Sequence, residues 1–161
     1  KMLEDTKFPQ QKRKNVQRAG ITTYEGFVLG DIRPWAIYRK DPKKPIQPHQ
    51  KMSQPKYKPI WALASKTMKA FNPAFRFTTI QFNKDNRAAK HKDKHNIGES
   101  YIIGLGNYTG GEILVYDKDG RNPKKIDIRN RFYKFNGSIY PHETAPFKGN
   151  RFTLVYFRAG K

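Results

Sequence analysis

The sequence contains no cysteine, and this absence excludes several classes of site. Disulfide frameworks, zinc–thiolate sites and thiol nucleophiles are ruled out, so any bound metal must be held by His, Asp or Glu. No apolar run is long enough to cross a bilayer, and the opening residues KMLEDTKFPQ lack the apolar stretch of a secretion signal. An intracellular, nuclear or virus-associated location is therefore favoured, although the sequence does not choose among them.

Acidic residues are scarce. The chain has 13 Asp and Glu residues against 33 Lys and Arg residues, which gives a formal net charge of +20. A charge of this size attracts polyanions and concerns partners, not fold. Nucleic acid, DNA in the first place, is the expected partner, and an acidic protein or a packaging surface is the alternative. The basic residues form no obvious amphipathic helix, so a membrane surface is not favoured.

Length and composition indicate one domain. A chain of 161 residues can bury a core of its own, and it shows no internal repeat. Residues 1–20 are polar and basic and are predicted to form an N-terminal arm, followed by a single jelly-roll domain at residues 21–161. Within that domain, residues 39–59 are rich in Pro, Lys and Gln and lack periodicity, which predicts a long basic loop.

One helix is expected, packed on the outside of the domain. Residues 60–71 contain good helix formers, and the pair Asn72 and Pro73 is expected to end the helix. The apolar side chains that we expect on one face of this helix are Trp61, Leu63, Ala64, Met68 and Phe71.

The rest of the chain is typical of β-structure. Short β-branched and aromatic stretches are separated by turn residues, among them Gly110 and Gly111, which are predicted to form a hairpin turn. Strands are expected at residues 24–29, 34–38, 75–82, 101–105, 112–116, 125–128, 131–135, 138–141 and 152–157. This many short strands favours a mainly β fold of the sandwich or jelly-roll type.

The stretch HKDKHN, from His91 to Asn96, is the first candidate for chemistry. His91 and Asp93 are two positions apart, a spacing that on a strand end directs both side chains to the same side. His142, near the end of a later predicted strand, is the natural third ligand. Two histidines and one carboxylate bind one face of a six-coordinate iron and leave the other positions open for a co-substrate and oxygen. A solvated polar turn is the plain alternative for HKDKHN.

Arg151 and Thr153 form a second candidate site. Arg151 opens the last predicted strand, and its planar guanidinium fits a carboxylate through two parallel hydrogen bonds. Thr153 is two residues further along, so its hydroxyl points the same way. Together they are predicted to hold a dicarboxylate such as 2-oxoglutarate.

In this order, the motifs resemble those of the iron(II)/2-oxoglutarate dioxygenases, whose fold is the double-stranded β-helix. The finer similarity is to the TET and J-base-binding-protein branch, which oxidises the methyl group of a nucleic-acid base. That branch has His-Arg-Asp-x-His-Asn where this chain has HKDKHN, and its TET members end with Arg-Leu-Ser-Leu-Val-Phe-Tyr-Gln-His where residues 151–159 are RFTLVYFRA. The segment GLGNYTGGEILVY resembles the Gly-Gly turn and strand of shorter fungal, algal and viral relatives. The resemblance covers roughly residues 78–158.

The resemblance implies an oxidoreductase that uses iron(II), 2-oxoglutarate and O2. The expected reaction is oxidation of a methyl group on a base, 5-methylcytosine or thymine in DNA. His91, Asp93 and His142 would be the metal-binding and catalytic residues, and Arg151 and Thr153 would bind the co-substrate. In a duplex the target base would have to be flipped out of the stack.

The substrate contacts follow from the same comparison. Asn96 matches the asparagine with which the family contacts the base, and His95 beside it is a further candidate. Lys92 and Lys94 are expected to grip phosphates, contacts that position a duplex without reading its sequence. Ala159 stands where TET enzymes have the histidine that reads cytosine, so the target base stays open.

Two rival functions remain. One is hydroxylation of a protein side chain, such as proline or lysine, by an enzyme of the same fold. The net charge of +20 and the HKDKHN match argue against it. The other is a non-catalytic basic protein, a nucleic-acid-binding or structural one, that has kept the pocket without turnover.

Overall fold

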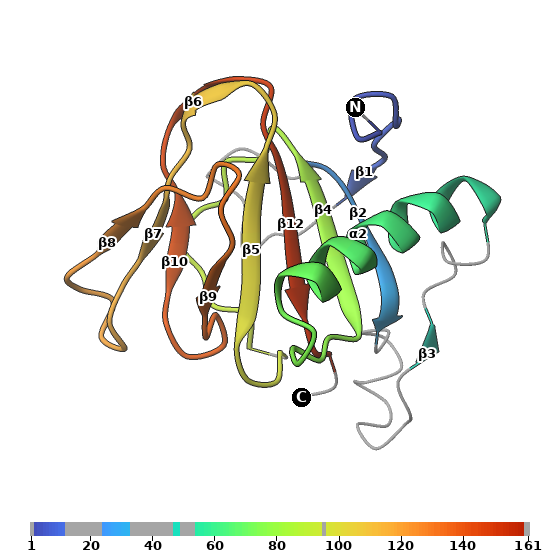
Figure 1. The fold of residues 1–161 in the computed structure, drawn as a ribbon. Coiled ribbons are helices and arrows are strands. Elements are labelled where there is room, and N and C mark those ends of the chain that lie inside the picture. The colour runs from blue at the N-terminus through green and yellow to red at the C-terminus, as the bar shows by residue number, and fades with distance from the viewer. Residues whose placement is uncertain (1, 12–23, 33–46, 49–53, 95, 160–161) are drawn as a thin grey trace.

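The computed structural model describes residues 2–11, 24–32, 47–48, 54–94 and 96–159 of the chain. One helix lies across a large antiparallel sheet, and small sheets lie beyond its left edge in the view of Figure 1. The strand expected at 34–38 lies outside the described residues. Among the described helices, none is long and apolar enough to cross a membrane.

All strand pairs between named strands are antiparallel. The large sheet has the order β1-β2-β4-β12-β5-β9, with β3 paired to β2. Its strands are β1 (Gln10–Gln11), β2 (Tyr24–Ile32), β3 (Gln47–Pro48), β4 (Thr79–Lys84), β5 (Ser100–Leu105), β9 (Tyr133–Phe135) and β12 (Phe152–Phe157). The second sheet is β10 (His142–Thr144), β7 (Ile113–Val115) and β8 (Lys124–Ile126), and the third pairs β11 (Phe147–Gly149) with β6 (Tyr108–Gly110). This arrangement confirms the mainly β prediction.

Alternation along the strands creates two cores. On β12, Phe152, Leu154 and Tyr156 face the helix and join the larger hydrophobic cluster. Val155, on the other face of the strand, packs against the smaller cluster, which also includes Ile113 of β7. The second face of the large sheet therefore looks toward the small sheets, and the candidate site residues lie on that side.

The expected helix is α2 (Lys58–Phe71), and it follows the short 3-10 helix η3 (Pro55–Tyr57). Asn72 has an extended backbone and its N–H bonds to the Met68 carbonyl, which ends the helix before Pro73. The predicted face needs correction, because Leu63 and Phe71 are 50% and 52% exposed. The side chains that α2 buries are Ile60, Ala64 and Met68.

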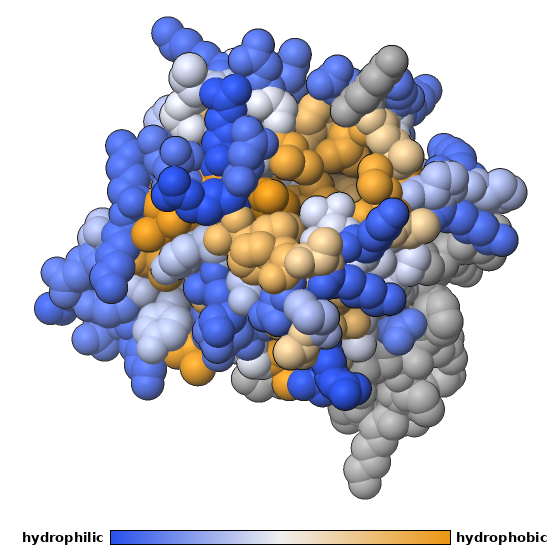
Figure 2. Space-filling view, in the orientation of Figure 1, coloured by the Kyte–Doolittle hydropathy of each residue, from blue (hydrophilic) through white to orange (hydrophobic). Residues whose placement is uncertain are grey.

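The surface around α2 is unusually apolar for so basic a chain. In the orientation of Figure 1, Figure 2 shows a largely hydrophilic surface interrupted by hydrophobic side chains near the helix and β5. On α2, Phe71 is 52% exposed and packs against Phe132 with ring centroids 4.5 Å apart. The exposed helix residues therefore cover the edge of the core without entering it.

Two strand predictions and one turn prediction were wrong in detail. The strand expected at 75–82 begins only at Thr79. Residues 138–141 form a turn, and the strand begins at His142 because Tyr140 N–H bonds back to Asn136 O. Gly110 and Gly111 do not close a hairpin: Gly110 ends β6, which pairs with β11, while β7 leaves for another sheet. The chain thus changes sheet at this Gly-Gly pair.

The described part of the expected N-terminal arm contacts the domain. β1 pairs with β2, and Phe8 is buried with its ring 4.9 Å from that of Phe27. Within the predicted loop at 39–59, β3 pairs with β2 and Tyr57 is 1% exposed. The domain boundaries stay a prediction.

Candidate metal centre and co-substrate site

His91, Asp93 and His142 lie together. Their ligand atoms are all within 4.8 Å of one another. Asp93 Oδ1 is 3.6 Å from His91 Nε2, and Asp93 Oδ2 is 3.2 Å from His142 Nε2. The three side chains are only 9%, 16% and 7% exposed, in sequence order. Residues separated by about a third of the chain are thus joined in one buried cluster.

Backbone pairing fixes the two histidines relative to each other. His91 and His142 form an isolated antiparallel bridge in which each N–H bonds to the other's carbonyl, at 3.0 and 2.9 Å. His91 Nδ1 lies 2.6 Å from the Ala89 carbonyl, and His142 Nδ1 lies 3.0 Å from that of Tyr140. Because a carbonyl only accepts, each Nδ1 carries the hydrogen, and each Nε2 presents its lone pair to the cluster.

Gly137 makes room for this arrangement. The Asp93 N–H bonds to its carbonyl at 2.8 Å. A Cβ at position 137 would lie 3.0 Å from His142 Cε1 and 3.2 Å from Asp93 Oδ2, closer than packed atoms comfortably approach. The Phe135 ring packs edge-on against His142, with centroids 4.9 Å apart. A small residue at 137 and an aromatic one at 135 therefore hold the ligands in place.

The donor set fits iron(II). Bonds of roughly 2.0–2.2 Å put neighbouring ligand atoms about 3 Å apart in an octahedral shell, close to the two separations from Asp93. Two imidazoles and one carboxylate on one face are typical of non-haem iron(II) sites with open positions. The structure thus brings together the three residues that the sequence pointed to.

Arg151 is 3% exposed, immediately before β12. Its Nη2 donates to the Gly111 carbonyl at 2.9 Å, and its Nη1 reaches that of Asn86 at 3.4 Å. Within the described residues, no carboxylate lies within 4.0 Å of the guanidinium, and Nε has no hydrogen-bond partner. Burial lowers the pKa of Arg151 below its usual range. A buried cation with an unused donor favours an anionic ligand.

Tyr108 was not predicted from the sequence, yet it belongs to the same site. It is 3% exposed, and its ring centroid is 5.6 Å from the Arg151 guanidinium carbon. Its hydroxyl lies near the guanidinium, which acts to lower the tyrosine pKa, but it makes no hydrogen bond of ordinary geometry within the described residues. Burial raises the pKa of this hydroxyl, so it stays a donor at neutral pH. A Cβ at Gly104 would overlap the hydroxyl, so only glycine leaves room for it. Nothing in the NYTGG motif indicates this role.

Thr153 lies on the same side of β12 as the second core. It is 4% exposed, and its Oγ1 accepts from Asn83 Nδ2 at 3.1 Å, which leaves the hydroxyl hydrogen free to donate. Asn83 Oδ1 in turn accepts from Gln81 Nε2 at 3.0 Å. The hydrogen bonds from Gln81 to Asn83 and from Asn83 to Thr153 thus fix the orientation of the Thr153 hydroxyl.

Arg151 Nε and Tyr108 Oη are suited to binding a carboxylate, such as one of 2-oxoglutarate. A carboxylate accepts up to four hydrogen bonds, and Arg151 Nε and Tyr108 Oη each lack an acceptor among the described residues. A bound carboxylate would satisfy both groups and neutralise the buried charge. Co-substrate binding by Arg151 and Thr153 stays a prediction, to which the position of Tyr108 adds a further candidate.

The predicted substrate contacts lie beside the metal cluster. Asn96 is half-buried and its N–H bonds to the Asp93 carbonyl at 3.1 Å, while Lys92 and Lys94 are exposed. Asn96 also forms an isolated bridge with Ala159. His95 lies outside the described residues. Substrate contacts by these residues stay predictions.

Several solved structures with a similar fold are oxygenases or hydroxylases. An oxidoreductase of the 2OG-Fe(II) oxygenase family from Burkholderia pseudomallei is 18% identical, with a TM-score of 0.61 over 96% of this chain and 74% of its own. NgTET1 in complex with 5mC DNA is 18% identical, with a TM-score of 0.55 over 83% of this chain and 60% of that one. A prolyl hydroxylase from Trichoplax adhaerens, in complex with a hypoxia inducible factor peptide fragment, is 12% identical, with a TM-score of 0.55 over 99% and 73%.

No protein-family model matches the chain, and neither does any curated protein. At these identities the structural similarity concerns the fold, which is the one that the sequence motifs implied. The 2OG-Fe(II) oxygenases are named for iron(II) and 2-oxoglutarate. These two groups agree with the cluster of His91, Asp93 and His142 and with the buried Arg151. The chain therefore has the double-stranded β-helix fold of the 2OG-Fe(II) oxygenases.

Proposed function

We propose that this chain is an iron(II)- and 2-oxoglutarate-dependent dioxygenase that oxidises a methyl group on a nucleic-acid base, 5-methylcytosine or thymine in DNA. The observation that carries the proposal is that a candidate metal site and a candidate co-substrate site occur in the same domain. Three metal-ligand atoms lie within 4.8 Å of one another, and a buried arginine lacks a carboxylate partner among the described residues. A buried arginine that has no carboxylate within 4.0 Å among the described residues is costly to the fold, so its position is better explained by an anionic ligand.

Iron(II) held by His91, Asp93 and His142 would bring O2 and 2-oxoglutarate together and supply the oxidising power that a methyl C–H bond demands. The chain's own residues would hold the geometry. The carbonyls of Ala89 and Tyr140 keep the two Nε2 lone pairs directed at the metal position. Arg151 and Tyr108 would fix the co-substrate through one carboxylate, which orients it before reaction.

Charge and position support nucleic acid as the substrate. The net charge is +20, and exposed Lys92 and Lys94 flank the metal ligand Asp93. Asn96 is tethered to Asp93 by a 3.1 Å hydrogen bond, so a base that contacts it would lie near the metal. Flipping the base costs a few kcal/mol, and phosphate contacts from the basic surface would offset that cost. NgTET1, a structure in complex with 5mC DNA, has the same fold.

A protein side-chain hydroxylase is the second candidate. The prolyl hydroxylase from Trichoplax adhaerens aligns over 99% of this chain with a TM-score of 0.55, and its partner is a peptide. The metal and co-substrate sites serve both reactions equally. The charge of +20 and the HKDKHN motif favour nucleic acid.

One assay separates these functions. The protein is incubated with iron(II), 2-oxoglutarate and ascorbate on matched DNAs containing thymine, cytosine or 5-methylcytosine, and succinate and oxidised bases are measured. A hydroxymethyl product that disappears in Asp93→Ala supports the proposal. Succinate release that needs a peptide and no nucleic acid identifies a side-chain hydroxylase. An iron-loaded protein that releases no succinate on either substrate is a non-catalytic binding protein.

A further inference from the structure

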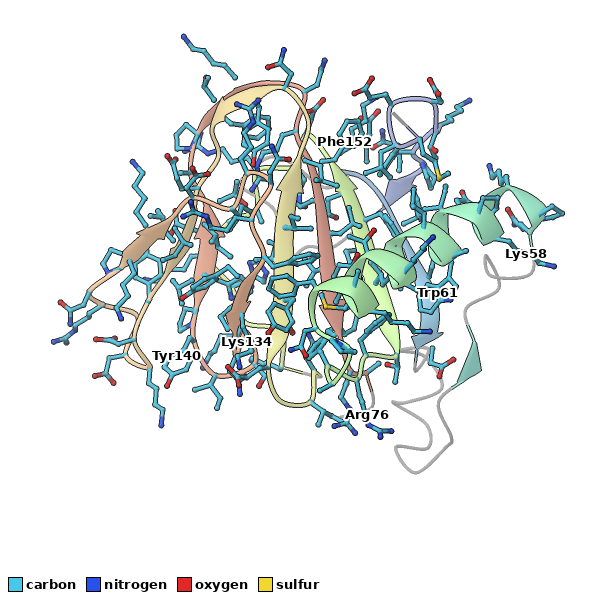
Figure 3. The ribbon with its side chains drawn as sticks, viewed as in Figure 1. Lys58, Trp61, Arg76, Lys134, Tyr140 and Phe152 are labelled. Atoms are coloured by element: carbon cyan, nitrogen blue, oxygen red, sulfur yellow. The ribbon has the colours of Figure 1, made fainter. Side chains whose placement is uncertain are left out.

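A groove of about 780 Å³ opens next to the metal centre, between β9 and the β7–β8 pair. Its size is that of a ligand pocket. Its lining includes Tyr116, Tyr133, Tyr140, Lys124, Lys134 and Asn136. Figure 3 labels Lys134 and Tyr140, which lie at the lower left of the view, near the lower ends of β9 and β10. None of the three metal-ligand candidates lines this groove.

Two of the three tyrosine rings of the groove, those of Tyr116 and Tyr133, are held in place. Tyr116 is half-buried, its hydroxyl donates to Glu143 Oε2 at 2.8 Å, and Lys90 Nζ lies 3.8 Å from its ring centroid. Tyr133 stacks with Phe135 at an interplanar angle of 18° and a centroid distance of 5.9 Å. Fixed aromatic rings contribute contact area with little loss of side-chain entropy on binding.

The groove is lined by two lysines, Lys124 and Lys134, and by two carboxylates, Glu99 and Asp117. Lys124 is exposed, and Lys134 has only a 3.9 Å ion pair with Glu99 in which both side chains are about half exposed. Such a pair is worth little, because solvent screens it. Asp117 also lines the groove, but its carboxylate accepts from the backbone of Asp119 and Arg121 and from Asn122 Nδ2, at 2.9–3.0 Å. The lining as a whole therefore carries no net positive charge. Lys124 has no carboxylate within 4.0 Å among the described residues, and the exposed pair of Lys134 with Glu99 is weak, so a phosphate can displace it.

One turn connects the groove to the metal centre. The Tyr140 carbonyl accepts from His142 Nδ1 at 3.0 Å, and Tyr140 N–H bonds to the Asn136 carbonyl at 3.0 Å. Phe135, which lines the groove, packs against the His142 ring. A molecule in the groove would thus lie one residue layer away from the metal ligands.

We infer that this groove binds an unpaired nucleotide of the substrate strand, next to the base in the catalytic pocket. The inference rests on the proposed function, because it takes nucleic acid as the substrate. Aromatic rings stack on any base whose face is free, and lysines on the rim hold the adjoining phosphates. Stacking needs a base that is out of its pair, so the groove selects a single-stranded or locally opened region.

The test is a binding measurement on the full chain, without 2-oxoglutarate, using a fluorescent single strand and the matching duplex. Tyr140→Leu should raise the Kd for the single strand about tenfold, because one stacking contact is lost. Tyr140→Phe keeps the ring and should bind like the wild type, and the duplex Kd should change little in either variant. Circular dichroism and iron binding verify that Tyr140→Leu keeps its fold and metal site.

A second test changes only charged residues on the rim and leaves the hydrophobic core intact. Lys124→Glu with Lys134→Glu should flatten the slope of log Kd against log salt for the single strand by about 1.4, since each single-strand phosphate contact contributes about 0.7. The matched control is Lys66→Glu with Lys69→Glu, an equal charge change on the exposed side of α2, which should keep the slope.

Equal slopes in the two charge variants, with wild-type single-strand binding by Tyr140→Leu, would overturn the inference. A Tyr140→Leu variant that loses affinity for an oligoproline peptide and keeps it for the oligonucleotide would also overturn it, by identifying a peptide groove. The proposed function can fail independently of the groove inference. If the oligonucleotide binds at the groove but no base is oxidised, only the proposed function is contradicted. If bases are oxidised but the groove variants bind the single strand like the wild type, only the groove inference is contradicted.

Discussion

Asn96 and Ala159 lie side by side in an isolated antiparallel bridge, which ties the HKDKHN loop to the residues that follow β12. The Ile97 N–H extends the pairing with a 2.8 Å bond to the Arg158 carbonyl. In the TET enzymes that the sequence resembles, position 159 carries the histidine that reads cytosine. The structure brings the two matching positions together, with a methyl group in place of the imidazole. Base selection is therefore expected to depend on this pair.

Asn96→Ala is expected to lower turnover on DNA at least tenfold while changing the Kd for DNA little. Phosphate contacts from exposed lysines supply most of the affinity, and the amide would act only on a base already in the pocket. Steady-state succinate release and anisotropy on the same DNA measure the two quantities. Charge reversal of Lys92 and Lys94 should instead raise the Kd for DNA and flatten the dependence of log Kd on log salt. A parallel loss of affinity in Asn96→Ala would assign it to general binding.

Ala159→His is expected to raise the ratio of oxidised 5-methylcytosine to oxidised thymine. An imidazole beside Asn96 restores a second polar group at the base edge, and a mismatched base would leave it unpaired. Ala159→Leu is the matched control, because it adds comparable bulk without a hydrogen-bonding group. The ratio is read by mass spectrometry in a competition between the two DNAs. A change of equal size in the His and Leu variants would indicate that bulk, not hydrogen bonding, sets the preference.

Asp93→Ala is expected to abolish iron(II) retention, because Asp93 supplies the only carboxylate of the cluster. Gly137→Ala should weaken iron binding without abolishing it, since the added Cβ would lie 3.0 Å from His142 Cε1. Asp119→Ala, which removes an exposed carboxylate, is the control and should retain iron. Metal content after desalting measures all three. Full iron occupancy in Asp93→Ala would remove this residue from the ligand set.

The candidate site could be predicted only where its residues follow a motif. The spacing of His91 and Asp93 and the order of His142 and Arg151 along the chain were enough to bring four residues into two sites. The role of Tyr108 was not predicted from the sequence, because it depends on β6 pairing with β11 and on the space at Gly104. No local sequence pattern encodes these two features. The groove beside the metal centre was not predicted either, because it is formed by residues from several strands and loops that are distant in the sequence.

The helix shows a similar limit. Its end could be predicted from Asn72-Pro73, and its start lies at Lys58, two residues before the expected one. Its buried face depends on how α2 lies across the sheet. Ile60, Ala64 and Met68 contact the core at intervals of four residues, whereas Leu63 and Phe71 lie at its edge. Hydrophobicity alone does not distinguish these two sets.

Met68→Ala is expected to lower the free energy of unfolding by about 2–5 kcal/mol, because the side chain is fully buried between α2 and the sheet. Leu63→Ala should cost about 0.5 kcal/mol or less, since Leu63 is half exposed. Urea unfolding followed by circular dichroism measures both. Equal losses in the two variants would show that Leu63 is as buried as the sequence pattern suggested.

Arg151→Lys is expected to raise the KM for 2-oxoglutarate about ten- to hundredfold, because lysine keeps the charge and loses the planar fork that binds a carboxylate. Tyr108→Phe removes one neutral donor and should raise the same KM about two- to tenfold. Tyr133→Phe, which removes a hydroxyl from the groove and not from this site, is the control. Succinate release at saturating iron(II) and DNA gives KM and kcat for each variant. An unchanged KM in Arg151→Lys would move the co-substrate away from Arg151. A change confined to that variant would leave Arg151 in place and exclude Tyr108, because the two unused donors are expected to share one carboxylate.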